Sequence, residues 1–444
     1  MPVVGGDEFR KADVSSGENS NGCSLAPRDE HDVKVDLADA LDRLEVGDRE
    51  LLAFLPESNR LERVLADVDL TVRRSDDAEP PDLIDVLVGV KDVINVDGLP
   101  TRAGSELPAT LFEGPEATIV QRLRASGALI AGKTTTTEFA FSEPGPTRNP
   151  RDLKRTPGGS SSGSAAAVAS GLVPIALATQ TVDSTVTPAA YCGVVGYKPT
   201  YQRMPLDGVI PFAPSMDHGG LITTDIATAR VAAAVVCDGW KGDSSASGVV
   251  LGVPADEYLH RAEKPAIEAF AAVIEALRRE GFDIVRTSSL ANIEPIALAH
   301  RRLVTAEFSR VHTDWFSQHG DHYRRRSAGL YLAGADLPES AITEGRESGK
   351  ILSRSLEDTM QQEGIVAWVS PSATGVAPLG LDYIGDPIMG LPWTHAHVPV
   401  VTLPATPSFK GLPLGIQLAG RIGGDEELLA LASLVEAALK AKGP

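Results

Sequence analysis

Cysteine is scarce in this chain of 444 residues, which holds three: Cys23, Cys192 and Cys237. A small, odd number of cysteines provides no disulfide framework and suits a reducing compartment. The chain also lacks any run of about 18 uncharged apolar residues, the length that a transmembrane helix requires. Its first residues lack the apolar core of a signal peptide, so we predict a cytoplasmic protein. Cys192 lies in an apolar stretch, where we expect a buried, unreactive thiol.

Basic residues are also fewer than acidic residues. The chain has 41 Lys and Arg against 60 Asp and Glu, a net charge of −19. Such a surface repels phosphate backbones and anionic membranes, so we expect neither nucleic acid nor a membrane as a partner. Apolar residues make up 43% and charged residues 23%, which is typical of a globular protein with a large core.

Apolar segments that alternate with helical patterns indicate the fold class. Residues 86–94 and 128–134 are short apolar runs typical of buried strands. Their alternation with amphipathic helices predicts an α/β fold, in which a mixed, mostly parallel sheet is sandwiched between helices. We predict a polar arm over residues 1–32 and a single large domain over 33–444. Residues of about 255–365 are charged and helical in pattern, and we interpret them as a helical insertion in that domain.

Several motifs that could suggest other chemistry are weak. Residues 127–134 match the phosphate-loop pattern, but the intervening residues form a compact apolar run that we interpret as the strand itself. His395 and His397 would share one face of an extended strand, and His319 and His322 lie in a polar helical region. Neither pair has further ligands at a recognised metal spacing. No nucleophile elbow of an α/β-hydrolase is present. We therefore expect no metal and no organic cofactor.

The most informative stretch is a Gly/Ser loop that runs into an Ala-rich helix at residues 156–171. Such loops bring backbone N–H groups and hydroxyls close to a ligand. It contains Ser160, and Ser184 follows farther along the chain. Lys91 interrupts an apolar strand, and burial would leave it a neutral amine able to act as a base. A base, a bridging hydroxyl and a nucleophilic hydroxyl form an alternative to the Ser-His-Asp triad.

In local structure, the patterns predict a helix over 162–171, a strand over 172–182, and a strand and turn over 188–200.

These motifs together resemble the amidase signature family of amide hydrolases. The similarity runs from about residue 84 to 240 and again from about 366 to 440. The segments that carry it are VGVKDVINVDGLPTRAGS, GALIAGKTTTTEFAF, PGGSSSGSAAAVASG, PAAYCGVVGYKPT and GLPLGIQLAGR. The resemblance implies the amidase signature fold.

The resemblance also implies roles for individual residues. Ser184 matches the nucleophile, Ser160 the bridging serine that follows a cis peptide bond, and Lys91 the general base. The backbone N–H groups of an oxyanion hole would come from Thr181, Val182, Asp183 and Ser184.

The second half of the family's signature differs in this chain. Where the family usually has T-D-T-G-G-S-I-R, this chain has Gln180, Val182, Asp183 and Val186 at the positions of Asp, the two Gly and Arg. The acid and the base are lost together, which leaves no unpaired buried charge. Val182 disfavours a positive φ. An ionised Asp183 about 4 Å from an oxyanion would repel it by roughly 4 kcal/mol. We therefore expect Asp183 to point away from the oxyanion and to contact substrate, water or a cation.

The leading hypothesis is a serine hydrolase that cleaves the C–N bond of amides or carbamates (urethanes). The apolar, aromatic loop at 372–397 should border the pocket and favour a small, neutral, partly hydrophobic substrate. Two alternatives remain open: the glutaminase subunit of a tRNA-dependent amidotransferase, and a catalytically impaired binding or scaffold protein. A homodimer is a further hypothesis.

Overall fold

The computed structural model describes residues 30–72, 82–242 and 250–441. The predicted N-terminal arm lies outside these residues except for its last three, where helix α1 (Glu30–Leu51) begins. A search of the described residues found no helix long and apolar enough to span a membrane.

The centre of the protein is one ten-stranded sheet, in the order β2-β1-β3-β5-β4-β9-β10-β8-β6-β7. Its strands are β1 (Leu87–Lys91), β2 (Leu129–Thr134), β3 (Ile175–Gln180), β4 (Val195–Lys198), β5 (His218–Thr223), β6 (Val250–Val253), β7 (Asp283–Arg286), β8 (Ala367–Pro371), β9 (Val400–Phe409) and β10 (Leu412–Ala419). Parallel pairs stand at the two ends, joining β2, β1 and β3 on one side and β8, β6 and β7 on the other. Antiparallel pairs join the strands between them. The prediction of a single domain with a mixed sheet between helices is confirmed.

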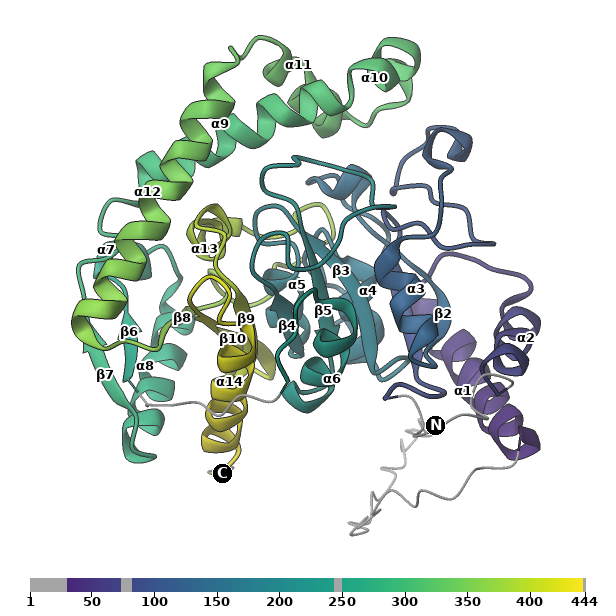
Figure 1. The fold of residues 1–444 in the computed structure, drawn as a ribbon, viewed down its shortest axis with the longest axis horizontal. Coiled ribbons are helices and arrows are strands. Elements are labelled where there is room, and N and C mark those ends of the chain that lie inside the picture. Colours follow the sequence, from purple (N-terminus) through teal and green to yellow (C-terminus); the bar gives the residue numbers. More distant parts are fainter. Residues whose placement is uncertain (1–29, 73–81, 243–249, 442–444) are drawn as a thin grey trace, which may run out of the picture.

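Helices cover both faces of this sheet (Figure 1). Besides α1, the α-helices of the described residues are α2 (Arg60–Val72), α3 (Thr118–Ala125), α4 (Ser162–Ala169), α5 (Val186–Cys192), α6 (Ile226–Val236), α7 (Asp256–Leu259), α8 (Lys264–Arg279), α9 (Ile293–Val311), α10 (Thr313–His319), α11 (Arg325–Ala335), α12 (Ser340–Glu363), α13 (Leu391–His395) and α14 (Asp425–Lys440). In β1, Leu87 joins one apolar core and Val88 the other, because successive side chains of a strand point to opposite faces. Both faces of β1 are therefore buried, which explains why every residue before Lys91 in this strand is apolar.

The region of about 255–365 contains helices α7 to α12 and the short strand β7. Helix α9 packs against α11 and α12, and these helices form an arc beside the body of the domain (Figure 1). Residues of α9 then reach back to the end of β3, where they line the cavity described below.

Two local predictions were wrong. Residues 188–200 were expected to form a strand and turn, but α5 occupies Val186–Cys192 and β4 begins only at Val195. A seven-residue helix is too short for periodicity to identify, and tertiary packing decided its conformation. His395 and His397 do not share a strand, since His395 ends α13 and His397 has a positive φ of 63°.

Candidate active site

Lys91 ends strand β1 and is completely buried, with 0% of its surface exposed. Its Nζ lies 2.7 Å from Ser160 Oγ, 2.8 Å from Thr179 Oγ1 and 3.3 Å from the Thr179 carbonyl oxygen. Among the described residues no carboxylate forms an ion pair with it. A neutral amine fits this site, because two N–H groups can donate to Thr179 while the lone pair accepts from the Ser160 hydroxyl.

The electrostatics of the site favour this neutral form. Burial lowers the pKa of Lys91 well below its ordinary value, and the Asp217 carboxylate opposes the shift only partly. Asp217 is itself occupied, since Oδ1 accepts from Thr181 Oγ1 at 2.6 Å and Oδ2 from the backbone of Phe212 at 2.8 Å. Desolvation without an ion-pair partner is the condition under which a lysine becomes a base near neutral pH.

Ser160 is held by the Gly/Ser loop that precedes α4. The peptide bond between Gly159 and Ser160 is cis, as the family resemblance implied. The Ser160 carbonyl accepts from Thr136 Oγ1 at 3.1 Å, and Ser162 Oγ donates to the Gly158 carbonyl at 2.8 Å. These contacts anchor the loop on both sides of Ser160, so its hydroxyl is fixed against Lys91.

Ser184 lies in the turn between β3 and α5. Its carbonyl accepts from the backbone N–H of Ser161 at 3.3 Å, which brings the loop of Ser184 beside that of Ser160. Ser184 is half-buried and lines a cavity of about 360 Å³. Its hydroxyl has no hydrogen-bond partner in the part of the chain that the structure describes, so it is free to meet a ligand in this cavity.

The same turn carries the predicted oxyanion loop. The backbone N–H groups of Val182, Asp183 and Ser184 donate to no acceptor within the described residues, although Thr187 N–H donates to the Asp183 carbonyl at 3.1 Å. Val182 has no positive φ, so the turn is built without the left-handed conformation that two glycines would permit. Unpaired N–H groups beside a free serine hydroxyl suit the stabilisation of a developing oxyanion.

The side chain of Gln180 stabilises this turn through hydrogen bonds. Its Oε1 accepts from the backbone N–H groups of Thr185 at 2.9 Å and Val186 at 3.1 Å. Its Nε2 donates to Thr394 Oγ1 at 2.9 Å, and Thr394 in turn donates to the Val182 carbonyl at 2.6 Å. The neutral amide therefore fulfils the acceptor role of a carboxylate here and adds a donor to α13.

Replacing this amide should destabilise the protein. In Gln180→Leu, two buried N–H groups lose their acceptor, and we expect the free energy of unfolding to fall by at least about 2 kcal/mol. Urea denaturation measures the change. The control is Gln121→Leu, because Gln121 is exposed and donates once, to the Glu116 carbonyl at 3.0 Å. We expect that variant to change stability by less than about 0.5 kcal/mol. Equal effects of the two substitutions would contradict the role of Gln180.

Asp183 is turned into the protein, with 2% of its surface exposed. Its Oδ2 accepts from the Thr187 hydroxyl, and its Oδ1 lies against Gly390. Burial raises the pKa of Asp183 well above its ordinary value, and the negative charge of Asp386 adds to the shift. The neutral acid is thus favoured, and the repulsion expected of an ionised carboxylate next to the oxyanion is removed. Among the described residues no cation pairs with Asp183; its contacts are Thr187 and Gly390, and it also lines the cavity described next, so contact with a substrate stays a prediction.

The cavity beside Ser184 is mainly apolar. Its apolar and aromatic lining residues are Ala140, Phe141, Val182, Phe212, Val304, Leu330, Tyr383, Ile384, Pro387, Ile388 and Leu391. Five of these, from Tyr383 to Leu391, belong to the loop at 372–397, which confirms that this loop borders the pocket. Helix α9 contributes His300 and Arg301.

Sequence reasoning missed three side chains of the site: Thr179, Asp217 and Thr394. Thr179 directly precedes Gln180, so its place in the motif could have drawn attention to it. Asp217 and Thr394 are distant in sequence from Lys91 and Ser184 and carry no local signal.

The remaining candidates lie elsewhere or have structural roles. Cys192 is buried, and burial raises the pKa of its thiol, as expected of an unreactive cysteine. Lys133 lies within β2 and forms an ion pair with Asp92 at 3.0 Å, which agrees with the strand interpretation of the phosphate-loop pattern. His395 Nδ1 lies 3.2 Å from Nδ1 of His300. No group of three or more potential metal ligands was found in the residues that the structure describes.

Comparison with known proteins places this geometry in a family. A family model described as Amidase matches residues 39–332. The A subunit of glutamyl-tRNA(Gln) amidotransferase from Koribacter versatilis (strain Ellin345) is 30% identical, over 90% of this chain and 93% of that protein. A crystal structure of an amidase is 31% identical, with a TM-score of 0.81 over 92% of this chain and 96% of that one. Native peptide amidase from Stenotrophomonas maltophilia is 26% identical, with a TM-score of 0.77 over 94% and 95% of the two chains. This protein therefore belongs to the amidase signature family of hydrolases that act on C–N bonds.

Proposed function

We propose that this protein hydrolyses the C–N bond of small, neutral, partly hydrophobic amides or carbamates through an acyl-enzyme on Ser184. The observation that carries the proposal is the buried contact of 2.7 Å between Lys91 Nζ and Ser160 Oγ, beside a cavity that the free Ser184 hydroxyl lines. Lys91 is the general base, Ser160 the proton relay and Ser184 the nucleophile.

The reaction proceeds in two halves. Neutral Lys91 takes the Ser160 proton while Ser160 takes the proton of Ser184, whose oxygen attacks the substrate carbonyl carbon. The N–H groups of the loop from Thr181 to Ser184 hold the oxyanion. As the tetrahedral intermediate collapses, the relay returns the proton to the leaving nitrogen and the C–N bond breaks. Water then attacks the acyl-enzyme by the same relay and releases the carboxylic acid. In the case of a urethane, the product of this step is a carbonic acid monoester, which loses CO2 to give the alcohol.

The cavity supports the proposed substrate class. Its volume of about 360 Å³ suits a small molecule, and aromatic walls at Phe141 and Phe212 suit an apolar group. The structure of peptide amidase shares this fold, and its name identifies an enzyme that acts on amides. The carbamate hypothesis rests on the same largely apolar lining, because a urethane differs from an amide by one ester oxygen.

The experiment is hydrolysis of a paired panel, an aryl amide and its matching alkyl carbamate, by wild type and Ser184→Ala. We expect turnover of at least one of the two by wild type and a loss of at least about 1,000-fold in the variant. A fluorophosphonate probe should label wild type and not the variant. Turnover that survives Ser184→Ala would contradict the assigned nucleophile. Absence of both turnover and labelling would favour the impaired binding or scaffold protein.

A second candidate is the glutaminase subunit of an amidotransferase. The similarity to the amidotransferase protein of Koribacter, which spans 93% of that protein, favours it. It predicts that free glutamine is hydrolysed and that a different subunit co-purifies. The largely apolar lining of the cavity favours the first candidate. Glutaminase assay and the mass of the purified particle separate the two, and the same mass measurement tests a homodimer.

A further inference from the structure

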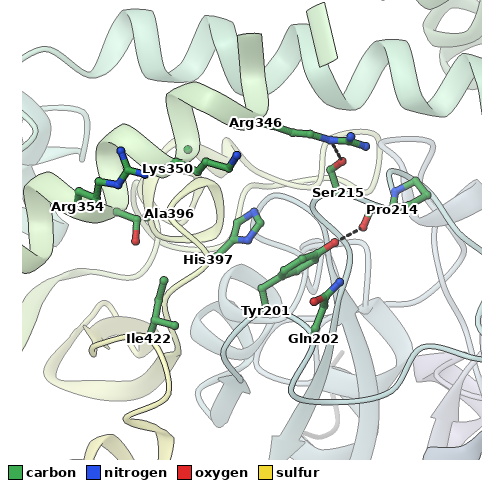
Figure 2. A pocket seen from close by; sticks show the side chains of 12 residues that line it. Tyr201, Gln202, Pro214, Ser215, Arg346, Lys350, Arg354, Ala396, His397 and Ile422 are labelled. Atoms are coloured by element: carbon green, nitrogen blue, oxygen red, sulfur yellow. Dashed lines mark hydrogen bonds between the residues drawn. The ribbon is translucent and has the colours of Figure 1, made fainter. Parts of the chain in front are cut away.

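A second cavity, of about 680 Å³, lies between helix α12 and the loops that carry Tyr201, Pro214 and His397 (Figure 2). It shares no lining residue with the cavity of Ser184. We call it the α12 cavity. One wall carries Arg346, Lys350 and Arg354 of α12, and the opposite wall carries Tyr201 and His397 (Figure 2). The catalytic relay uses none of these residues.

The charge of this cavity has one sign. Arg346, Lys350 and Arg354 follow one another at intervals of four residues, so they project from one side of the helix on successive turns. No aspartate or glutamate is among the residues that line the cavity. In a chain with a net charge of −19, three cations without a carboxylate on one cavity wall are a local reversal of the overall charge.

Two of the three cations have little or no compensation. Arg346 is held, since it donates to Ser215 Oγ at 2.6 Å and forms an ion pair with Glu307 at 2.8 Å. Lys350 lies 3.8 Å from Glu347, and both side chains are mostly exposed. Arg354 is exposed and has no hydrogen bond or ion pair in the part of the chain that the structure describes.

The acidic residues of the same helix segment lie on another side. Glu344 and Glu347 line a different cavity, together with Leu290. Like charges at intervals of four residues destabilise a helix, and among the described residues the exposed contact of Lys350 with Glu347 is the one intrahelical ion pair of Lys350 and Arg354. An anion bound in the α12 cavity would remove that repulsion.

The opposite wall is preorganised. The rings of Tyr201 and His397 have centroids 4.2 Å apart, and Tyr201 Oη donates to the Pro214 carbonyl at 2.7 Å. Gln202 and His397 both have positive φ values, 62° and 63°, which are costly for residues other than glycine. Burial lowers the pKa of His397 to about 4, so this wall adds a ring face and hydrogen-bonding groups without a charge.

We propose that the α12 cavity binds a small organic anion with two negative charges, of the dicarboxylate or diphosphate type. Four residues of helix separate Lys350 from Arg354, a distance of about 6 Å along the axis. Two anionic groups at that spacing match the two cations, and a planar or apolar part of the ligand would lie on Tyr201 and His397. The volume of about 680 Å³ leaves room for such a ligand rather than for a single inorganic ion.

Titration calorimetry with succinate and with methyl diphosphate, at constant ionic strength, tests the proposal. We expect wild type to bind at least one probe, and the one it binds more tightly identifies the anion type. In Lys350→Ala/Arg354→Ala the affinity should fall at least about tenfold, because two charge-assisted contacts are lost. The control Lys264→Ala/Arg278→Ala removes the same charges from exposed positions of α8 and should bind as wild type does.

Several results would overturn the proposal. They are failure of wild type to bind either probe, equal affinity in the α12 double variant, and an equal loss of affinity in the α8 control. Thermal unfolding without ligand guards against misfolding: the α12 variant should melt at or above the temperature of wild type, since it loses like charges on one face. Lys350→Arg/Arg354→Lys, which keeps both charges, should retain binding.

Discussion

Lys91→Met should lower kcat/KM by at least about 1,000-fold, because the proposed general base is removed while its buried volume is nearly retained. Initial rates on the panel substrate measure the loss. In wild type, the rate should rise with pH through the lowered pKa of Lys91 and then level off, since the neutral amine is the active form. The control is Lys198→Met. Lys198 is also fully buried, and burial lowers its pKa to about 7, but it donates to the Val398 carbonyl at 2.6 Å. That variant should keep the pH profile of wild type.

The stability of Lys91→Met provides an independent test of the neutral lysine. In the unfolded chain, Lys91 binds a proton below about pH 10.4, whereas in the folded protein it is neutral down to its lowered pKa. Between these values the unfolded state binds more protons, so the stability of wild type rises with pH. The variant lacks this contribution. Its stability relative to wild type should therefore increase as the pH falls, by up to about 1.4 kcal/mol per pH unit. A difference that does not vary with pH, or a wild-type rate that falls steadily from about pH 6 to pH 9, would contradict a neutral base.

Gly390→Ala should impair both stability and catalysis. An ideal Cβ at this position would lie 1.9 Å from Asp183 Oδ1 and 2.2 Å from its Cγ. Gly390 has an ordinary φ of −93°, so the effect would come from the clash and not from the backbone. Overpacking of this kind costs about 1–3 kcal/mol. Asp183 must shift, and because it adjoins Ser184 we expect kcat/KM to fall about 100-fold.

A double variant and a control isolate the cause. Asp183→Ala/Gly390→Ala removes the carboxyl group that the new methyl would strike, so it should recover part of the activity that Gly390→Ala loses. Such non-additivity is the signature of a direct contact. Gly329→Ala, at an exposed position of α11 with nothing within 4 Å of its Cβ, should be neutral or stabilise by about 0.5–1 kcal/mol. Full activity of Gly390→Ala would contradict the packing of Asp183 described here.

The sequence by itself determined the parts whose signal is local. The apolar runs of β1, β2 and β3 identified these strands because a strand buried on both faces is apolar at most of its positions. The Ala-rich segment after the Gly/Ser loop predicted α4, because a helix buried on all sides also has mostly small or apolar residues. The family resemblance also singled out Lys91, Ser160 and Ser184 from their motifs, and their catalytic roles stay a prediction.

The tertiary structure decided what depends on contacts between distant segments. Strand β1 pairs with both β2 and β3, and this order places Thr179 beside Lys91 and removes both from water. Asp183 meets Gly390 only because α13 packs on the oxyanion loop, and this burial, rather than the residue's identity, favours its neutral form. Desolvation and neighbouring groups from distant parts of the chain set the pKa of an acid or a base in a protein. A sequence pattern predicts neither, so it could not predict the charge state of Lys91 or Asp183.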